Sequence, residues 1–190
     1  MKEQITQITE KGLKELLNTC LLPVPLYGQG EANTLEEMCR CINRGDFYLI
    51  EEKGFLKRCV TVVAMFVFSK DQSMVLVEKM QILKDGRIRE RKLDASIGEM
   101  VKTDEDPKVA ALRALKEEFP VALMCGGADT LSQGKGFCRV KKSPTYPDLV
   151  TEYSFHVFSV QLKVDIPLCQ TLVYEEETGF ATIFDWEPVK

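Results

Sequence analysis

The sequence of 190 residues contains a single histidine, His156, and this scarcity excludes several kinds of active site. A Ser-His-Asp triad and a zinc site built on histidines both need that side chain in a defined arrangement with other residues. His156 lies in the stretch TEYSFHVFSVQL, whose composition is typical of a β-strand. We therefore interpret it as a strand residue and expect neither a histidine base nor a histidine-bound metal.

A large excess of positive charge is also absent. Lysine and arginine number 25 and aspartate and glutamate 29, which gives a formal net charge of −4. Proteins that bind nucleic acid through their overall charge are basic, so that class is excluded, although local basic patches remain open. The longest apolar run, residues 60–68, is too short to span a bilayer, and residues 1–12 lack the apolar core of a secretion signal. No membrane partner is expected.

The cysteines do not form a disulfide pattern. There are seven, an odd number, and they are scattered along the chain. Scattered thiols favour a reducing compartment, so we expect an intracellular, cytoplasmic protein, with an organelle as the alternative. Cys39 and Cys41 stand two residues apart with no second pair nearby, which is a poor arrangement for zinc.

The order of predicted elements indicates an α/β protein. Strand-like stretches lie on both sides of one helix, which implies a mixed β-sheet covered by helices. Residues 1–57 contain two short helices and are interpreted as an N-terminal helical extension that packs on the core. Residues 58–190 are interpreted as the main domain.

A helix is expected over residues 107–119. Asp106 suits the N-cap, and Pro107 suits the first helical position, because proline fixes φ and lacks an N–H that would be unpaired there. Pro120 disfavours the α conformation of the residue before it and should end the helix. Apolar residues at spacings of three and four are expected to face the core: Val109, Leu112, Leu115 and Phe119.

Two adjacent carboxylates, Glu117 and Glu118, share one edge of this helix. They repel each other, and they lie in the last turn, where the helix dipole disfavours negative charge. Arg113, four residues before Glu117, offsets part of this charge, and a hard cation such as Mg²⁺ can offset the rest. The alternative is a solvated helix edge with ordinary charge pairs.

The stretch from Gly98 to Val121, GEMVKTDEDPKVAALRALKEEFPV, resembles the Nudix box. The matching positions are a glycine before a loop, a glutamate, an arginine eight residues later and two helical glutamates: Gly98, Glu105, Arg113, Glu117 and Glu118. In element order the resemblance extends over residues 60–186. It implies a Nudix-like α/β/α sandwich with a mixed β-sheet, and a metal-dependent hydrolase of a nucleoside diphosphate linked to another moiety.

The resemblance also implies the residues of a site. The metal, Mg²⁺ or Mn²⁺, would be held by Glu105, Glu117, Glu118 and Glu99. The catalytic residues would be Glu117, Glu118, Arg113 and Glu152, the last from a strand where many Nudix enzymes place a further acidic residue. An exposed loop position without a partner is the alternative for Glu99.

The box departs from its usual form in one residue that bears on catalysis. Ala114 stands where the first of three helical glutamates is expected, and alanine has no metal ligand to offer. If the chain is a weakened enzyme, Ala114→Glu is expected to restore a third ligand and raise turnover. Asp104 and Pro120 replace two glycines of the pattern.

Substrate contacts are expected from Gly98, from Tyr146, and from Arg87, Arg89 and Arg91. The three arginines alternate, so in a strand they share one face and form a candidate phosphate grip. A solvated edge strand is the alternative. The Tyr146 ring, expected in a loop, is a candidate for stacking on a base, with simple packing as the alternative.

Three functions are compatible with this pattern. The first is a Nudix-type hydrolase whose partner is a small nucleotide-type diphosphate. The second is an inactive Nudix-fold module that binds a nucleotide, or nucleic acid only as capped RNA, without cleaving it. The third is a scaffold or interaction protein. The pattern specifies neither the diphosphate nor the oligomeric state.

Overall fold

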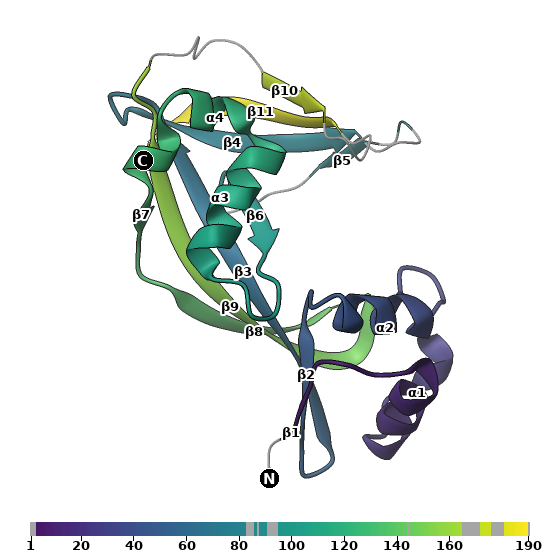
Figure 1. The fold of residues 1–190 in the computed structure, drawn as a ribbon. Helices are drawn as coiled ribbons and strands as arrows, with labels where there is room; N and C mark the ends of the chain where they lie inside the picture. The colour runs from purple at the N-terminus through teal and green to yellow at the C-terminus, as the bar shows by residue number, and fades with distance from the viewer. Residues whose placement is uncertain are drawn as a thin grey trace. The chain divides into compact units, whose positions relative to one another are not determined.

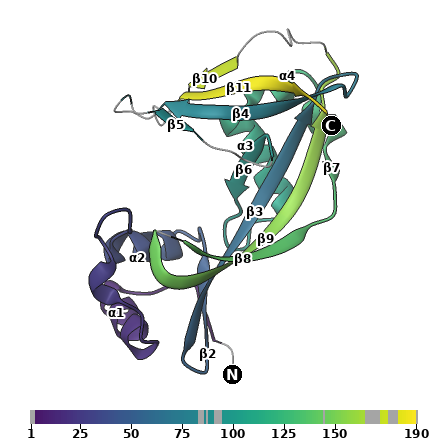
Figure 2. The same ribbon diagram turned by 180° about the vertical axis from the view of Figure 1, so that it is seen from behind.

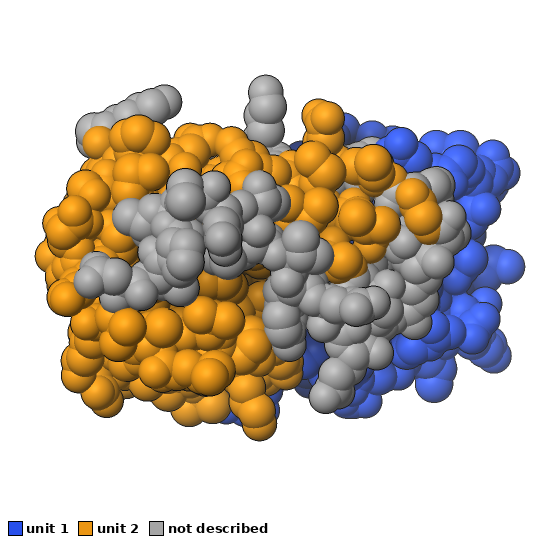
Figure 3. All heavy atoms as spheres, turned by 90° about the horizontal axis from the view of Figure 1, so that it is seen from above, with its two compact units in different colours: residues 1–62, 100–105, 137–155 blue, residues 63–99, 106–136, 156–190 orange. Residues whose placement is uncertain are grey.

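The computed structural model describes residues 3–82, 86, 88–90, 95–143, 145–164, 172–175 and 181–189. The chain forms two compact units, which are coloured separately in Figure 3. Unit 1 contains residues 1–62, 100–105 and 137–155, and unit 2 contains residues 63–99, 106–136 and 156–190.

Helices and strands are both present, as Figures 1 and 2 show from opposite sides. The helical segments are α1 (Glu10–Thr19), η1 (Val24–Leu26), α2 (Leu35–Asn43), α3 (Pro107–Glu118), α4 (Pro120–Met124) and η2 (Gly127–Thr130). The strands are β1 (Glu3–Ile5), β2 (Tyr48–Glu52), β3 (Phe55–Phe68), β4 (Met74–Ile82), β5 (Ile88–Glu90), β6 (Ile97–Met100), β7 (Ser132–Gln133), β8 (Phe137–Ser143), β9 (Tyr146–Gln161), β10 (Leu172–Glu175) and β11 (Ala181–Pro188).

The strands form one sheet, with the order β1-β2-β3-β4-β11-β10 along its main path. Strand β6 pairs with β3, strand β5 pairs with β4, and β9 pairs with β3, β7 and β8. The predicted α/β class with a mixed sheet is confirmed. The domain boundary expected at residue 57 stays a prediction.

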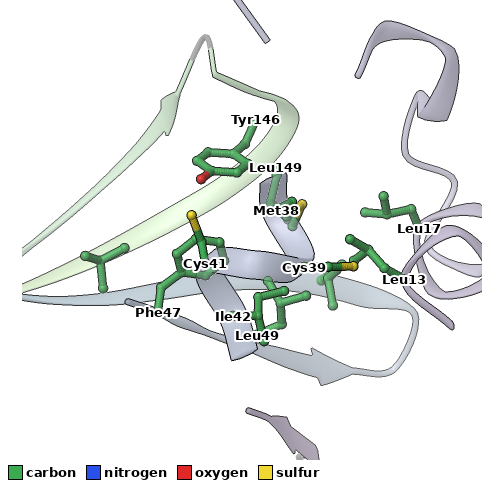
Figure 4. Close-up of a cluster of buried hydrophobic side chains, with 12 residues drawn as sticks. Leu13, Leu17, Met38, Cys39, Cys41, Ile42, Phe47, Leu49, Tyr146 and Leu149 are labelled. Atoms are coloured by element: carbon green, nitrogen blue, oxygen red, sulfur yellow. The ribbon is translucent and has the colours of Figure 1, made fainter. Parts of the chain in front are cut away.

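The core of unit 1 joins α1 and α2 to β2, the first part of β3 and the start of β9. Figure 4 shows Leu13 and Leu17 of α1 beside Met38 and Cys39 of α2. Burial is the main cause that raises the pKa of the Cys39 and Cys41 thiols, so both stay protonated. These cysteines are core residues.

Local signals set the boundaries of α2 and of the hairpin that follows it. The Thr34 hydroxyl accepts a hydrogen bond from the Glu37 N–H at 3.1 Å, which caps the first turn of α2. Strands β2 and β3 are joined by Lys53 and Gly54, both with positive φ (55° and 81°). A two-residue turn with two positive φ values matches the twist of the strands that it connects.

A buried carboxylate, Asp46, joins the end of α2 to the loop before α3. Its side chain is 1% exposed, accepts a hydrogen bond from Arg44 Nε at 2.8 Å and forms an ion pair with Lys102. Next to it, the Thr103 N–H donates to the Gly45 carbonyl at 2.8 Å. Burial alone would raise the pKa of Asp46, but the hydrogen bonds from Arg44 and Lys102 outweigh burial and hold this pKa below its usual value. We call this arrangement the Asp46 clamp.

Replacing Asp46 with asparagine is expected to lower the free energy of unfolding by about 1.5–3 kcal/mol at neutral pH, because hydrogen bonds to a charged acceptor are lost. The pKa of Asp46 is lower in the folded chain, so its contribution is present above the unfolded pKa and disappears as the pH falls through the folded pKa. Urea denaturation of both proteins across acidic pH measures this. A difference in stability that stays constant down to the lowest pH would contradict the role of the Asp46 charge.

In unit 2, helix α3 has the boundaries that the sequence predicts. The Asp106 carboxylate accepts from the N–H of Lys108 at 2.8 Å, and Pro107 occupies the first turn. At the other end Phe119 has left the α region (φ −148°), as expected for a residue before proline. The end of α3 therefore follows from Pro120 and not from a glycine.

The buried face of α3 agrees with the predicted one only in part, at Leu115 and Phe119. Its buried residues are Ala110, Ala111, Ala114 and Leu115, followed by Phe119 at the C-cap. The prediction of a buried Val109 was wrong, because its side chain is 56% exposed. The helix instead turns its alanines to the interior, since small side chains allow a helix backbone to approach its neighbours closely.

Within the residues that the structure describes, no helix is long and apolar enough to cross a membrane.

Candidate functional site

Arginine and glutamate meet at one edge of α3 in unit 2. Arg113 Nη1 donates to Glu99 Oε1 at 2.9 Å and to Glu117 Oε2 at 3.3 Å. The Arg113 and Glu99 side chains are each 25% exposed, so this pair is partly shielded from water. Glu117 lies four residues along the helix from Arg113, which is the spacing that brings side chains together on a helix surface. One nitrogen therefore holds carboxylates from two elements, β6 and α3.

The structure shows where Glu99 lies relative to Arg113, which the sequence does not. It belongs to strand β6 and carries an ion pair with Arg113, so it is not an isolated loop glutamate. Gly98 precedes it in the same strand. The contact spans fourteen residues, and helical or strand periodicity cannot reveal a contact between two different elements.

Ala114 occupies the centre of the buried face of α3 and is fully buried. Glu117, three residues further along the helix, is exposed. Glu118, the next residue, is half-buried at the end of the helix. Ala114 is therefore a packing residue in this structure.

Two of the predicted acidic residues belong to unit 1 and have local partners there. Glu105 Oε2 accepts from the Lys102 N–H at 2.9 Å, which closes the loop before α3. Glu152 Oε2 accepts from Lys57 Nζ at 2.7 Å, across strands β9 and β3. The prediction that Glu105 and Glu152 share one site with the glutamates of α3 stays a prediction.

The structure describes only some of the residues that are predicted to contact a substrate. Arg87 and Arg91 lie outside the described residues, and Arg89 lies in β5 with its Cα opposite that of Gln81 in β4. Tyr146 begins strand β9 and is only 4% exposed.

The Tyr146 ring is enclosed by core residues. It lies edge-on to Phe47 with ring centroids 5.5 Å apart, and the Arg58 guanidinium lies 4.3 Å from its centroid. Burial is the largest cause of the raised pKa of Tyr146. The aromatic residue expected to stack on a base is therefore a core residue of unit 1.

An apolar cleft in unit 2 was not foreseen from the sequence. It has a volume of about 410 Å³ and is lined by parts of β3, β4 and β11 and by residues just before β6. The lining residues are Phe66, Phe68, Val75, Leu76, Val77, Ala95, Ser96, Glu187, Pro188 and Val189. Because these segments are far apart in sequence, only the folded sheet brings them together.

Comparisons with known proteins give no match to a family model and none to a curated protein. Among solved structures, the Escherichia coli dihydroneopterin triphosphate pyrophosphohydrolase is 18% identical over 67% of this chain and 80% of its own, with a TM-score of 0.44. DR0079 from Deinococcus radiodurans is 19% identical over 68% and 67%, with a TM-score of 0.37. A MutT structure from a study of Aliivibrio salmonicida and Vibrio cholerae is 14% identical over 68% and 80%, with a TM-score of 0.31.

The structural neighbours are Nudix hydrolases. At these identities and TM-scores, the likeness carries no argument about the activity or the substrate of this chain. Activity and substrate must be argued from the residues of this chain.

The described side chains do not fit a complete Nudix metal centre. Among the residues whose positions the structure gives, no group of three His, Cys, Asp or Glu side chains could hold a metal ion. Two of the expected ligands, Glu99 and Glu117, are hydrogen-bonded to Arg113, and Ala114 supplies no oxygen. A hard cation such as Mg²⁺ needs several oxygen ligands around it, and this arrangement offers it too few.

Proposed function

We propose that this chain is a Nudix-type module that binds the diphosphate of a nucleotide-type ligand without efficient cleavage. The observation that supports this most directly is the buried alanine at position 114. Alanine has no oxygen to offer a metal ion, and metal-assisted hydrolysis depends on a set of oxygen ligands that hold the ion.

Binding of a diphosphate requires positive charge near the α3 edge. Arg113 is a described cation at that edge, where its Nη1 contacts both Glu99 and Glu117. The predicted phosphate grip of Arg87, Arg89 and Arg91 would add charge of the same kind. Guanidinium groups suit phosphate because their paired N–H donors match two phosphate oxygens.

A second candidate function is the Mg²⁺- or Mn²⁺-dependent hydrolase that the box implies. The observation that favours it is the convergence of Glu99 and Glu117, since two carboxylates from separate elements approach a common atom. Glu118 follows directly in sequence. This candidate requires ligands beyond those that the described residues bring together.

A ligand panel is expected to show binding without turnover. The panel contains nucleotide sugars, dinucleoside polyphosphates, ADP-ribose, coenzyme A and capped RNA, with binding measured by titration calorimetry and cleavage by phosphate release, with and without Mg²⁺ or Mn²⁺. Arg113→Gln is expected to weaken binding of the best ligand about tenfold, because a charged hydrogen bond to phosphate is lost. The matched control is Lys116→Gln, which removes one exposed positive charge from the same helix.

The outcomes separate the three readings. Rapid, metal-dependent cleavage of a panel member would replace the proposal with the hydrolase. If no member of the panel binds, the remaining candidate is a scaffold or interaction protein. An equal loss of affinity in Arg113→Gln and Lys116→Gln would show that Arg113 has no specific contact with the ligand.

A further inference from the structure

We propose that one face of the β8–β9 hairpin in unit 1 binds single-stranded nucleic acid by stacking bases on its aromatic rings. This face carries Phe137, Arg139, Lys141, Tyr153 and Phe155, and we call it the aromatic ladder. The proposal is independent of the α3 edge and goes beyond the proposed function.

The rings of the ladder lie on the same side of the hairpin and are nearly parallel. Phe137 is paired directly with Phe155 across the two strands, and directly opposed residues share one face of a sheet. Their ring centroids are 4.6 Å apart with an interplanar angle of 16°. Tyr153 continues the row, 6.0 Å from Phe155 and inclined by 23°. Phe137 is 45% exposed, so a large apolar ring faces solvent at the end of the row.

Positive charge is interleaved with these rings. The Arg139 guanidinium lies 5.8 Å from the centroid of Phe137, and Lys141 Nζ lies 5.0 Å from that of Tyr153. Both cations are exposed, and this face of β8 and of residues 151–155 carries no carboxylate. The nearest acidic residue in the pairing, Glu152, points to the opposite face, where it pairs with Lys57. The charge of the ladder therefore complements a phosphate backbone, although the whole chain is acidic.

Tyr153 is held in place by Arg58, a buried residue of the neighbouring strand β3. Arg58 Nη2 donates to the Tyr153 hydroxyl at 2.9 Å, and Arg58 Nε donates to the Thr151 hydroxyl at 3.2 Å. A ring fixed by a hydrogen bond to a buried residue loses little further freedom when a ligand stacks on it. The ladder is thus preorganised, which lowers the entropic cost of binding.

Aromatic rings on a sheet, interleaved with cations, provide the two contacts that single strands use. Bases stack on the rings, and the cations follow the backbone. A duplex keeps its bases stacked inside and cannot use the rings. Pairing of β8 with a second copy of the chain is less favourable, because charged residues along an exposed edge strand oppose such pairing.

The test uses the full chain and labelled oligonucleotides of mixed sequence, as single-stranded RNA, single-stranded DNA and the corresponding duplexes, in fluorescence polarisation. The parent is expected to bind a single strand more tightly than a duplex, and the RNA and DNA arms show which strand it prefers. Phe137→Ala is expected to weaken binding about tenfold, as for the loss of one stacked base. Lys141→Ala is expected to weaken binding. It should also reduce the slope of log affinity against log salt concentration by about one, as for the loss of one phosphate contact.

Matched controls come from the opposite face of the same strand. Val140→Ala removes an exposed apolar side chain, and Lys142→Ala removes a cation that otherwise pairs with Asp148 at 3.0 Å. Both are expected to bind as the parent does. The proposal is overturned if these controls lose as much affinity as the ladder variants, if duplexes bind as tightly as single strands, or if no strand binds. It is also overturned if sedimentation shows that the ladder instead holds two copies of the chain together. Arg113→Gln is expected to leave binding of single strands unchanged. Failure of the aromatic-ladder proposal and failure of the proposed function can therefore be told apart.

Discussion

Ala114→Glu is expected to destabilise the chain by about 3–5 kcal/mol instead of restoring an enzyme. Ala114 is fully buried on the interior face of α3, so a glutamate there must either bury an uncompensated carboxylate or push the helix away from its neighbours. The pKa of a buried carboxyl is raised, so the loss of stability is expected to shrink at acidic pH, where the group is neutral. Urea denaturation of parent and variant measures the effect.

A position on the same helix provides the control. Val109 is exposed, so Val109→Glu adds the same charge without burying it and should change the stability by less than about 0.5 kcal/mol. If Ala114→Glu instead kept the parental stability and gained Mg²⁺-dependent cleavage of a diphosphate, the chain would be a weakened hydrolase, and the binding-module proposal would have to be abandoned.

Arg58→Ala is expected to lower the free energy of unfolding by a similar amount, about 3–5 kcal/mol. The Arg58 guanidinium lies between aromatic rings of unit 1, 4.8 Å from the centroid of Phe47 and 4.3 Å from that of Tyr146. Truncation leaves a cavity among these rings and removes the donor to the fully buried Thr151 hydroxyl. Thermal and urea denaturation both report the change.

The neighbouring residue offers a direct comparison. Lys57→Ala removes a cation from the same strand, but its pair with Glu152 is partly exposed, and such pairs contribute about 0.2–1 kcal/mol. Arg58→Lys keeps the charge and loses the planar guanidinium group. Its loss of free energy of unfolding should therefore lie between those of Arg58→Ala and Lys57→Ala. Equal stability of Arg58→Ala and Lys57→Ala would show that the contacts of Arg58 with the aromatic rings add nothing to the core.

Local signals in the sequence predicted the ends of the elements well. Asp106, Pro107 and Pro120 act on their immediate neighbours, and α3 accordingly runs from Pro107 to Glu118. The Thr34 cap of α2 and the turn at Lys53 and Gly54 are local devices of the same kind. These devices depend only on the φ angle and on hydrogen bonds within a few residues, so sequence alone specifies them.

Contacts between separate helices and strands cannot be predicted from such local signals. Of the residues expected on the buried face of α3, Leu115 and Phe119 are buried, whereas Val109 is exposed and alanines complete the face. The ion pair of Glu99 with Arg113 and the enclosure of Tyr146 by Arg58 both join separate elements. The aromatic ladder cannot be predicted from the sequence for the same reason, since it depends on the register of β8 against β9.

The Asp46 clamp has a consequence for how this protein can change over evolutionary time. Lys102 and Thr103, in the loop that leads into α3, find their partners 56 and 58 residues earlier, at Asp46 and Gly45. Recombination that exchanged the first 57 residues for an unrelated segment would remove both partners while leaving every residue of the box unchanged. The N-terminal segment and the box are therefore expected to be inherited together, and a transplanted box would bring a loop without its anchor.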